Sequence, residues 1–152
     1  MRALTIGLSV LLFAGCGSRV REKAELFPVV ASVRINGESA AGVRLTLRPK
    51  DGKPVDAYNA RPSGLSDENG DVFFMTYEPM DGVPTGTYVV TLDWPNMPPG
   101  GPITPKDRLK GTFNKVGAID TEVNVDGSGP ITLEPIEIEF EDPLPAVDME
   151  EM

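Results

Sequence analysis

The stretch GTYVVTLDW, residues 86–94, decides the fold class of this chain. Tyr88, Val90, Leu92 and Trp94 alternate with residues that include a threonine and an aspartate. Side chains two positions apart lie on the same face of a β-strand, so this spacing predicts a strand with one buried face. The glycine and proline residues immediately before it are typical of a turn that leads into such a strand.

The same period of two recurs along the chain, and 16 glycines and 15 prolines supply frequent turn signals. We therefore expect an all-β domain of seven strands, within a range of six to eight, arranged as an antiparallel two-sheet β-sandwich. The other predicted strands are 29–35, 43–47, 63–66 at a sheet edge, 71–77 at a sheet centre because it is apolar on both faces, 121–125 and 136–140. Turns are expected at residues that tolerate a positive φ, namely Asn36, Gly37, Gly70, Gly82 and Gly86.

The single cysteine, Cys16, follows an apolar run of signal-peptide length at the N-terminus, which is too short for an ordinary transmembrane helix. The segment LFAGC, residues 12–16, looks like a bacterial lipobox, in which the thiol is acylated and the signal is cut before the cysteine. We expect a signal helix within residues 1–15 and a lipid anchor at Cys16. The anchor would hold the protein to a bacterial membrane in the cell envelope, with its domain facing the periplasm or the cell surface. The alternative is an ordinary secretory signal with an incidental cysteine.

The remaining boundaries follow from changes in composition. Residues 16–27 are charged and lack a helical stripe, so we expect a tether. The strand pattern fills residues 28–141, which we interpret as one β-sandwich domain. Residues 142–152 are rich in proline and acids and predict a disordered acidic tail.

The composition excludes several classes of function. The formal net charge of −9 argues against nucleic-acid binding, which requires clustered cations. No histidine is present, so histidine-dependent catalysis and the commonest transition-metal ligand are missing. We expect no enzyme activity and no cofactor. Carboxylate pairs such as Asp67 with Glu68, or Glu78 with Asp81, leave a glycosidase as a remote alternative.

The segment SDENGDVFF, residues 66–74, is a candidate calcium site. Asp67, Asn69 and Asp71 supply oxygen ligands at alternating positions. The glycine of this segment does not stand where an EF-hand loop requires it. A tight turn that leads into a strand explains the same residues without a metal.

The segment 94–113 is the longest irregular stretch of the domain and is a candidate binding loop. Trp94 and Phe113, with Tyr58 as a possible neighbour, would form an apolar platform on which a sugar could stack. The alternative is that Trp94 closes the edge of the sandwich and Phe113 packs against it.

Four motifs in order resemble a known family: VRINGESAAGVRLTLRPKD, GLSDENGDVFF, DGVPTGTYVVTLDWP and DRLKGTF. The chain is similar to the small lipoproteins of planctomycete-type bacteria that carry a carboxypeptidase regulatory-like domain. The resemblance covers about residues 29–140 and implies a transthyretin-like Greek-key β-sandwich. It does not imply peptidase activity, because the zinc-binding residues of the catalytic domain are absent.

Together these observations predict a lipid-anchored, non-catalytic envelope module with a structural or protein-interaction role. The alternative is a surface module that binds carbohydrate or Ca²⁺ through the 94–113 loop or the 67–71 turn. The expected partners are the membrane, through the anchor at Cys16, and an unknown envelope protein or glycan, with no nucleic acid.

Overall fold

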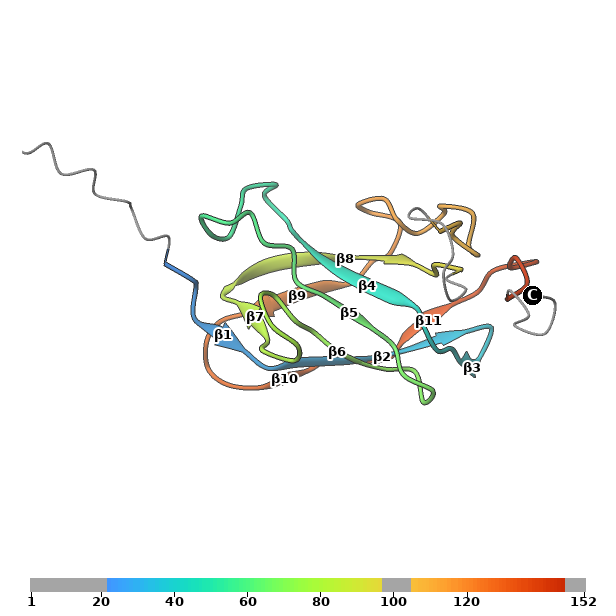
Figure 1. The fold of residues 1–152 in the computed structure, drawn as a ribbon, viewed down its shortest axis with the longest axis horizontal. Coiled ribbons are helices and arrows are strands. Elements are labelled where there is room, and N and C mark those ends of the chain that lie inside the picture. Colours follow the sequence, from blue (N-terminus) through green and yellow to red (C-terminus); the bar gives the residue numbers. More distant parts are fainter. Residues whose placement is uncertain (1–21, 97–104, 147–152) are drawn as a thin grey trace, which may run out of the picture.

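The computed structural model of the protein describes residues 22–96 and 105–146, and these form an all-β domain (Figure 1). None of these residues belongs to a helix long and apolar enough to cross a membrane. The strands are β1 (Leu26–Phe27), β2 (Val29–Ile35), β3 (Glu38–Ser39), β4 (Arg44–Pro49), β5 (Ser63–Leu65), β6 (Asp71–Phe73), β7 (Val83–Pro84), β8 (Gly86–Asp93), β9 (Glu122–Val125), β10 (Ile131–Thr132) and β11 (Ile136–Ile138). The all-β prediction is confirmed, with more and shorter strands than the seven expected.

Two sheets form the domain. One is antiparallel with the order β5-β4-β8-β9, and its register places Leu45 opposite Leu92 and Leu47 opposite Val90. The other is built around β2, which pairs with β6 and β3 along one edge and with β10 and β11 along the other. A small separate pair, β1 with β7, closes one end of the domain.

The core lies between the two sheets and follows the period of two. The apolar residues that recur with a period of two are buried in both sheets, as half-buried strands require. They are Val29, Ala31, Val33 and Ile35 from β2, Leu45 and Leu47 from β4, Tyr88, Val90 and Leu92 from β8, Val123 and Val125 from β9, and Ile136 and Ile138 from β11.

The prediction that the sandwich is wholly antiparallel is wrong for its last strands. β10 and β11 both pair with β2 in the parallel direction. β9 ends with Val125 opposite Gly86, and the chain then crosses to the other sheet at the end where β2 begins. Because it enters this sheet beside the start of β2, it runs in the same direction as β2.

β5 is the outer strand of its sheet, as predicted for residues 63–66. β5 pairs with β4 on one side, and bridges from Ser63 to Met75 and from Ser66 to Val72 connect it to the β6 segment on the other. β6 is shorter than the predicted strand 71–77. Beyond residue 75, backbone N–H groups bind a side chain, as described below, and therefore do not pair with a neighbouring strand.

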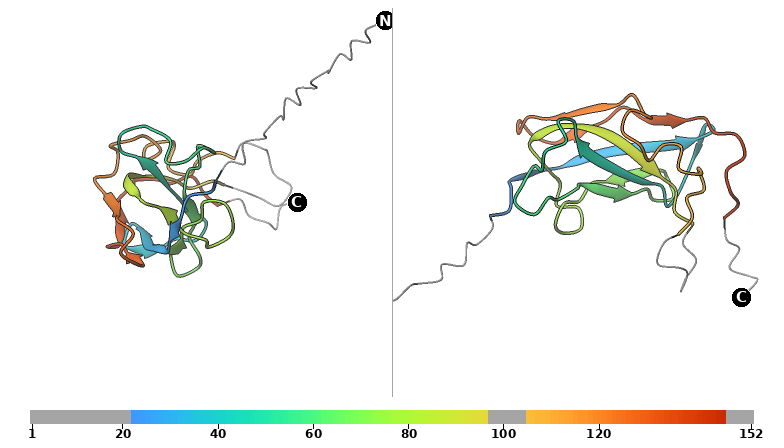
Figure 2. Two further views of the ribbon diagram at one scale, coloured as in Figure 1. Left: turned by 90° about the vertical axis from the view of Figure 1, so that its left-hand side faces the viewer. Right: turned by 90° about the horizontal axis from the view of Figure 1, so that it is seen from above.

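The two described ends of the chain lie at opposite ends of the domain (Figure 1, Figure 2). Part of the predicted tether contacts the domain, because β1 pairs with β7 and Lys23 pairs with Glu78. The predicted tail also begins in contact with the domain, since the Leu144 N–H donates to the Arg108 carbonyl at 2.9 Å. The predicted signal peptide, Cys16 and residues 147–152 lie outside the described residues.

The predicted turn residues all have positive φ: Asn36, Gly37, Gly70, Gly82 and Gly86. Gly70 is required for space as well as for conformation, because a Cβ atom there would lie 2.5 Å from the Val33 carbonyl oxygen. Asn36 also holds the C-terminal strand: its side chain donates to the Phe140 carbonyl oxygen and accepts the Phe140 N–H.

Candidate functional site

Tyr58, the neighbour considered for the platform of Trp94 and Phe113, does not lie beside Trp94. β4 and β8 run antiparallel, with Pro49 opposite Tyr88 and Arg44 opposite Asp93. The loop after Pro49, which carries Tyr58, is therefore at the opposite end of β8 from Trp94. The length of β8 puts roughly 25 Å between these ends.

Trp94 lies at one end of the sandwich, partly buried against the core, and is held there by two polar contacts. Its indole Nε1–H donates to the Ala41 carbonyl oxygen at 2.9 Å. The Arg108 guanidinium lies 3.5 Å from the centre of the indole ring and covers it as a cation–π contact. Phe113 packs edge-on against Phe140, with ring centres 6.0 Å apart. Part of the predicted 94–113 loop, residues 97–104, lies outside the described residues.

The candidate calcium segment forms a tight turn. The Asp67 Oδ1 atom accepts the backbone N–H groups of Asn69 and Asp71, each at 2.9 Å. These bonds occupy an oxygen that a cation would use and fix the turn that leads into β6. In the described part of the chain, no group of three aspartate, glutamate, cysteine or histidine side chains is placed to hold a metal ion.

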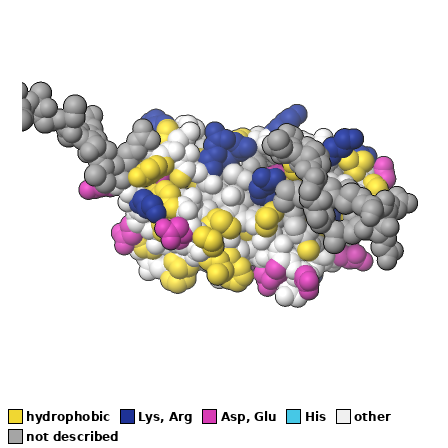
Figure 3. Space-filling view, in the orientation of Figure 1, with side chains coloured by type: hydrophobic (Ala, Val, Ile, Leu, Met, Phe, Trp, Pro, Cys, Tyr) yellow, Lys and Arg dark blue, Asp and Glu magenta, His cyan; other side chains and the backbone are white. Residues whose placement is uncertain are grey.

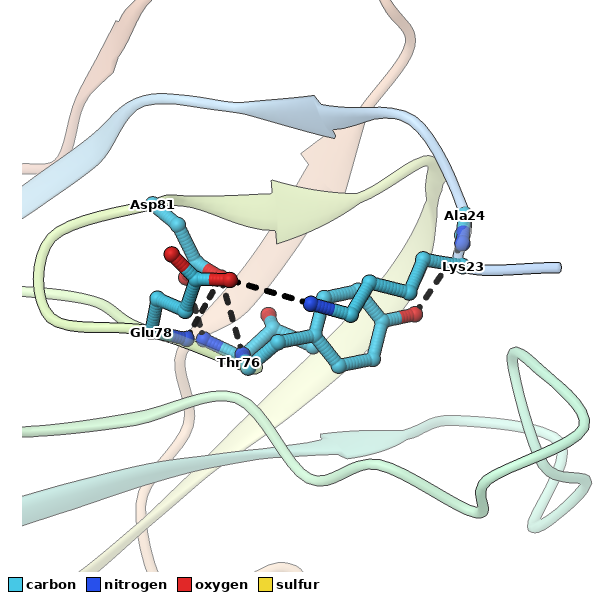
Figure 4. A network of polar contacts seen from close by, with 6 residues as sticks. Lys23, Ala24, Thr76, Glu78 and Asp81 are labelled. Atoms are coloured by element: carbon cyan, nitrogen blue, oxygen red, sulfur yellow. Dashed lines mark hydrogen bonds and ion pairs between the residues drawn. The ribbon is translucent and has the colours of Figure 1, made fainter. Parts of the chain in front are cut away.

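A polar network at the end of β6 contains Glu78 and Asp81, one of the carboxylate pairs considered from the sequence (Figure 4). The Asp81 carboxylate accepts the backbone N–H groups of Thr76, Tyr77 and Glu78 at 2.7, 2.9 and 2.7 Å. Burial by itself raises the pKa of Asp81, but these three hydrogen bonds outweigh it and the pKa is lowered. Asp81 therefore folds the segment after β6 into a loop.

Tyr77 joins this loop to two other parts of the chain. Its hydroxyl group accepts the Ala24 N–H at 3.1 Å and donates to the Asp56 carboxylate. The Tyr77 ring packs edge-on against Tyr58, with ring centres 5.9 Å apart. Lys23 adds an ion pair of 3.1 Å to Glu78. The contacts of Ala24 and Lys23 fasten the N-terminal segment to the domain, and those of Asp56 and Tyr58 fasten the loop after β4, so we interpret the network as structural.

A hollow of about 670 Å³ lies beside the loop that follows β4. Lys50 and Lys53 line it, but they pair with Glu122 and Asp51 respectively. The lining charges therefore cancel, and no aromatic side chain is present for a sugar to stack upon. The charged groups of this hollow are therefore engaged with one another and not directed at a ligand.

The outer face of β5 and β6 exposes large apolar side chains. Leu65, Phe73 and Met75 are 47%, 49% and 37% exposed. The bridges from Ser63 to Met75 and from Ser66 to Val72 set a register in which Leu65 lies opposite Phe73. Hydrophobic side chains gather over these strands in Figure 3. We call the surface formed by Leu65, Phe73 and Met75 the β5–β6 face.

A groove of about 220 Å³ runs beside Phe73 and extends the β5–β6 face across β2. Phe73 and Leu133 form its apolar walls, and Val30, Ala31 and Ser32 line the part that belongs to β2. Phe73 pairs with Val30 across the strands, so the apolar surface is continuous from β5 to β2. The described residues offer this continuous face as a candidate protein-interaction surface.

Comparison with known proteins adds little to this description. No protein-family model matches the chain, and no curated protein matches it. Among solved structures, the major pilin subunit BcpA of Bacillus cereus is similar at 16% sequence identity and a TM-score of 0.40. The match covers 78% of this chain and 30% of the pilin chain. With a TM-score this low, the likeness does not identify the function or the assembly of this chain.

Proposed function

We propose that this protein is a non-catalytic interaction module that presents the β5–β6 face to another protein. The observation that carries the proposal is the in-register exposure of Leu65 and Phe73, with Met75 beside them. Exposed apolar surface costs free energy in water, and a contiguous patch on a soluble domain is typical of a site that a partner covers. The carboxylates of the polar network are occupied by structural hydrogen bonds, which agrees with a role without catalysis.

The proposal includes a lipid anchor at Cys16, which would place the module in a bacterial cell envelope. The lipobox-like segment before Cys16 supports this part. The described chain leaves the domain at the end where β1 lies, while β5 and β6 run along its side, so an anchored domain would keep the β5–β6 face accessible. The transthyretin-like Greek-key connectivity and the planctomycete-type lipoprotein family also remain proposals, supported by the order of the sequence motifs.

Site-specific photocrosslinking in the producing cell tests the interaction. A photoreactive phenylalanine analogue at Phe73 should give a discrete covalent adduct with one protein. The same analogue at Asn124, an exposed position on β9, is the matched control and should not give that adduct. Loss of the adduct when Leu65→Ser is also present would support the β5–β6 face as the surface that contacts the crosslinked protein. No adduct at Phe73, or the same adduct from both positions, would reject the proposal.

The anchor is tested by the intact mass of protein extracted from membranes. A chain that begins at residue 16 and carries several acyl groups is expected, and a Cys16→Ala variant should lose both features. An unmodified mass would mean that the chain is not lipidated.

A further inference from the structure

One end of the β5–β6 face, where the turn between β5 and β6 lies, is acidic. Arg44, which lies opposite Leu65 on β4, is paired with Asp93 at 2.9 Å. Asp71 is exposed on β6, two residues before Phe73, and therefore lies on the same face at roughly 7 Å along the strand. It also borders the groove that Phe73 and Leu133 enclose. A peptide segment bound in this groove would therefore contact the Asp71 carboxylate.

More carboxylates lie beyond Asp71 at the same end of the face. Asp67 and Glu68 are exposed in the turn between β5 and β6. That turn lies against β2 and β3, because the Val33 N–H donates to the Gly70 carbonyl at 2.8 Å, and Glu38 is exposed on β3. Acidic side chains flank the apolar patch in Figure 3.

These carboxylates are not neutralised by ion pairs within the described chain. Asp67, Glu68, Asp71 and Glu38 form no ion pair with any residue of 22–96 or 105–146. The cation nearest to them along β2 is Arg34, whose Nε atom lies 4.0 Å from a Glu137 carboxylate oxygen. The negative charge at this end of the face is therefore available to a partner.

The negative charge at this end of the face limits which kind of partner can bind there. A second copy of the chain would bring another net charge of −9 toward the face, and like charges disfavour such a contact. A membrane with anionic lipids is disfavoured for the same reason. A polypeptide with nonpolar side chains for the groove and lysine or arginine beside them satisfies both features.

We infer that the β5–β6 face takes a cationic, nonpolar segment of a partner protein, with a nonpolar side chain beside Phe73 and basic side chains against Asp71 and Glu68. This inference rests on the proposed interaction function and adds the chemistry of the partner. It also predicts that binding weakens as salt is added, because exposed charges are screened.

The test uses the purified full chain and a fluorescein-labelled peptide of alternating lysine and valine, followed by fluorescence anisotropy. Charge reversal by Glu68→Lys with Asp71→Lys should weaken binding at least tenfold and should create binding to a glutamate–valine peptide. The matched control, Glu139→Lys with Glu141→Lys, changes the net charge equally at the β11 end and should alter affinity less than twofold. Phe73→Ser should also weaken binding at least tenfold. If Phe73→Ser does not fold, Leu65→Ser replaces it and should weaken binding in the same way.

Several outcomes would overturn the inference. Equal effects of the two charge-reversed variants would mean that the lysine–valine peptide responds to net charge alone. Binding to phosphatidylglycerol vesicles that Phe73→Ser abolishes would indicate a lipid surface. A dimer in sedimentation that Phe73→Ser dissolves would indicate a second copy. A photocrosslinked adduct at Phe73 with no effect of Glu68→Lys and Asp71→Lys would retain the proposed function and reject only the cationic partner.

Discussion

The two faces of β6 carry similar residues and have different surroundings. Val72 and Phe74 point into the sandwich and are 0% and 1% exposed, whereas Phe73 between them is 49% exposed. Both faces are apolar in sequence, yet only one is covered by the opposite sheet. The difference shows that apolarity alone does not fix burial, because a strand in a two-layer domain has only one inner face.

The largest expected effect is on the inner face. Phe74→Ala should lower the free energy of unfolding by about 3–5 kcal/mol, because it removes a fully buried ring and leaves a cavity. Phe73→Ala is its matched control and should cost less than about 1 kcal/mol, as expected for a half-exposed side chain. Urea denaturation measures both. Equal losses would break the distinction between the two faces.

The contact between β5 and β6 gives the next effect. A Cβ atom at Gly64 would lie 2.5 Å from the Phe73 carbonyl oxygen and 2.7 Å from the Val72 Cγ1 atom. Gly64→Ala should therefore cost about 1–3 kcal/mol, because backbone must move to admit the methyl group. Ser63→Ala in the same strand should cost less than about 1 kcal/mol. An unchanged melting temperature in Gly64→Ala would mean that β5 and β6 do not pack in close contact at this position.

The loop after β6 extends the comparison to polar groups. Asp81→Ala should cost about 1–3 kcal/mol, because it leaves three backbone N–H groups without their acceptor. The pKa of Asp81 is lowered in the folded protein from its ordinary value of 3.8. Its stabilisation is therefore present above pH 3.8 and is lost as the pH falls through the folded value. The free energy of unfolding should therefore fall less between pH 7 and pH 2 in Asp81→Ala than in the native protein, as urea denaturation at each pH would measure.

The smallest effect concerns the N-terminal segment. Tyr77→Phe removes the hydroxyl group between Ala24 and Asp56 and should cost about 1 kcal/mol. Burial, and next the hydrogen bond to Asp56, raise the pKa of Tyr77 above 10.0. The contribution is present below pH 10.0 and is lost as the pH rises through the folded value. Hydrogen exchange should quicken at residues 24–27 in the variant while β4 and β8 stay protected, and uniform quickening would contradict a local role.

The sequence predicted the core positions of β2, β4 and β8 because their apolar residues alternate without ambiguity. It did not predict the outward position of Phe73, because Phe73 and Phe74 are adjacent and either could have faced inward. The run of consecutive apolar residues indicated only that this strand is either buried on both faces or exposes one apolar face. Nor did the sequence predict that Tyr58 lies away from Trp94, because the loop that carries Tyr58 and the residues after β8 are placed at opposite ends of β8 by the pairing of β4 with β8.

The sequence by itself determined the all-β class, the inward residues of the long strands and the turn positions at Asn36 and Gly70. These depend on local spacing and on the φ that a single residue can adopt. Only the tertiary structure decided that β10 and β11 run parallel to β2, that β5 is bridged to β6, and that Leu65 and Phe73 share an exposed face. Those features depend on pairings between residues far apart in the chain, which no local pattern specifies.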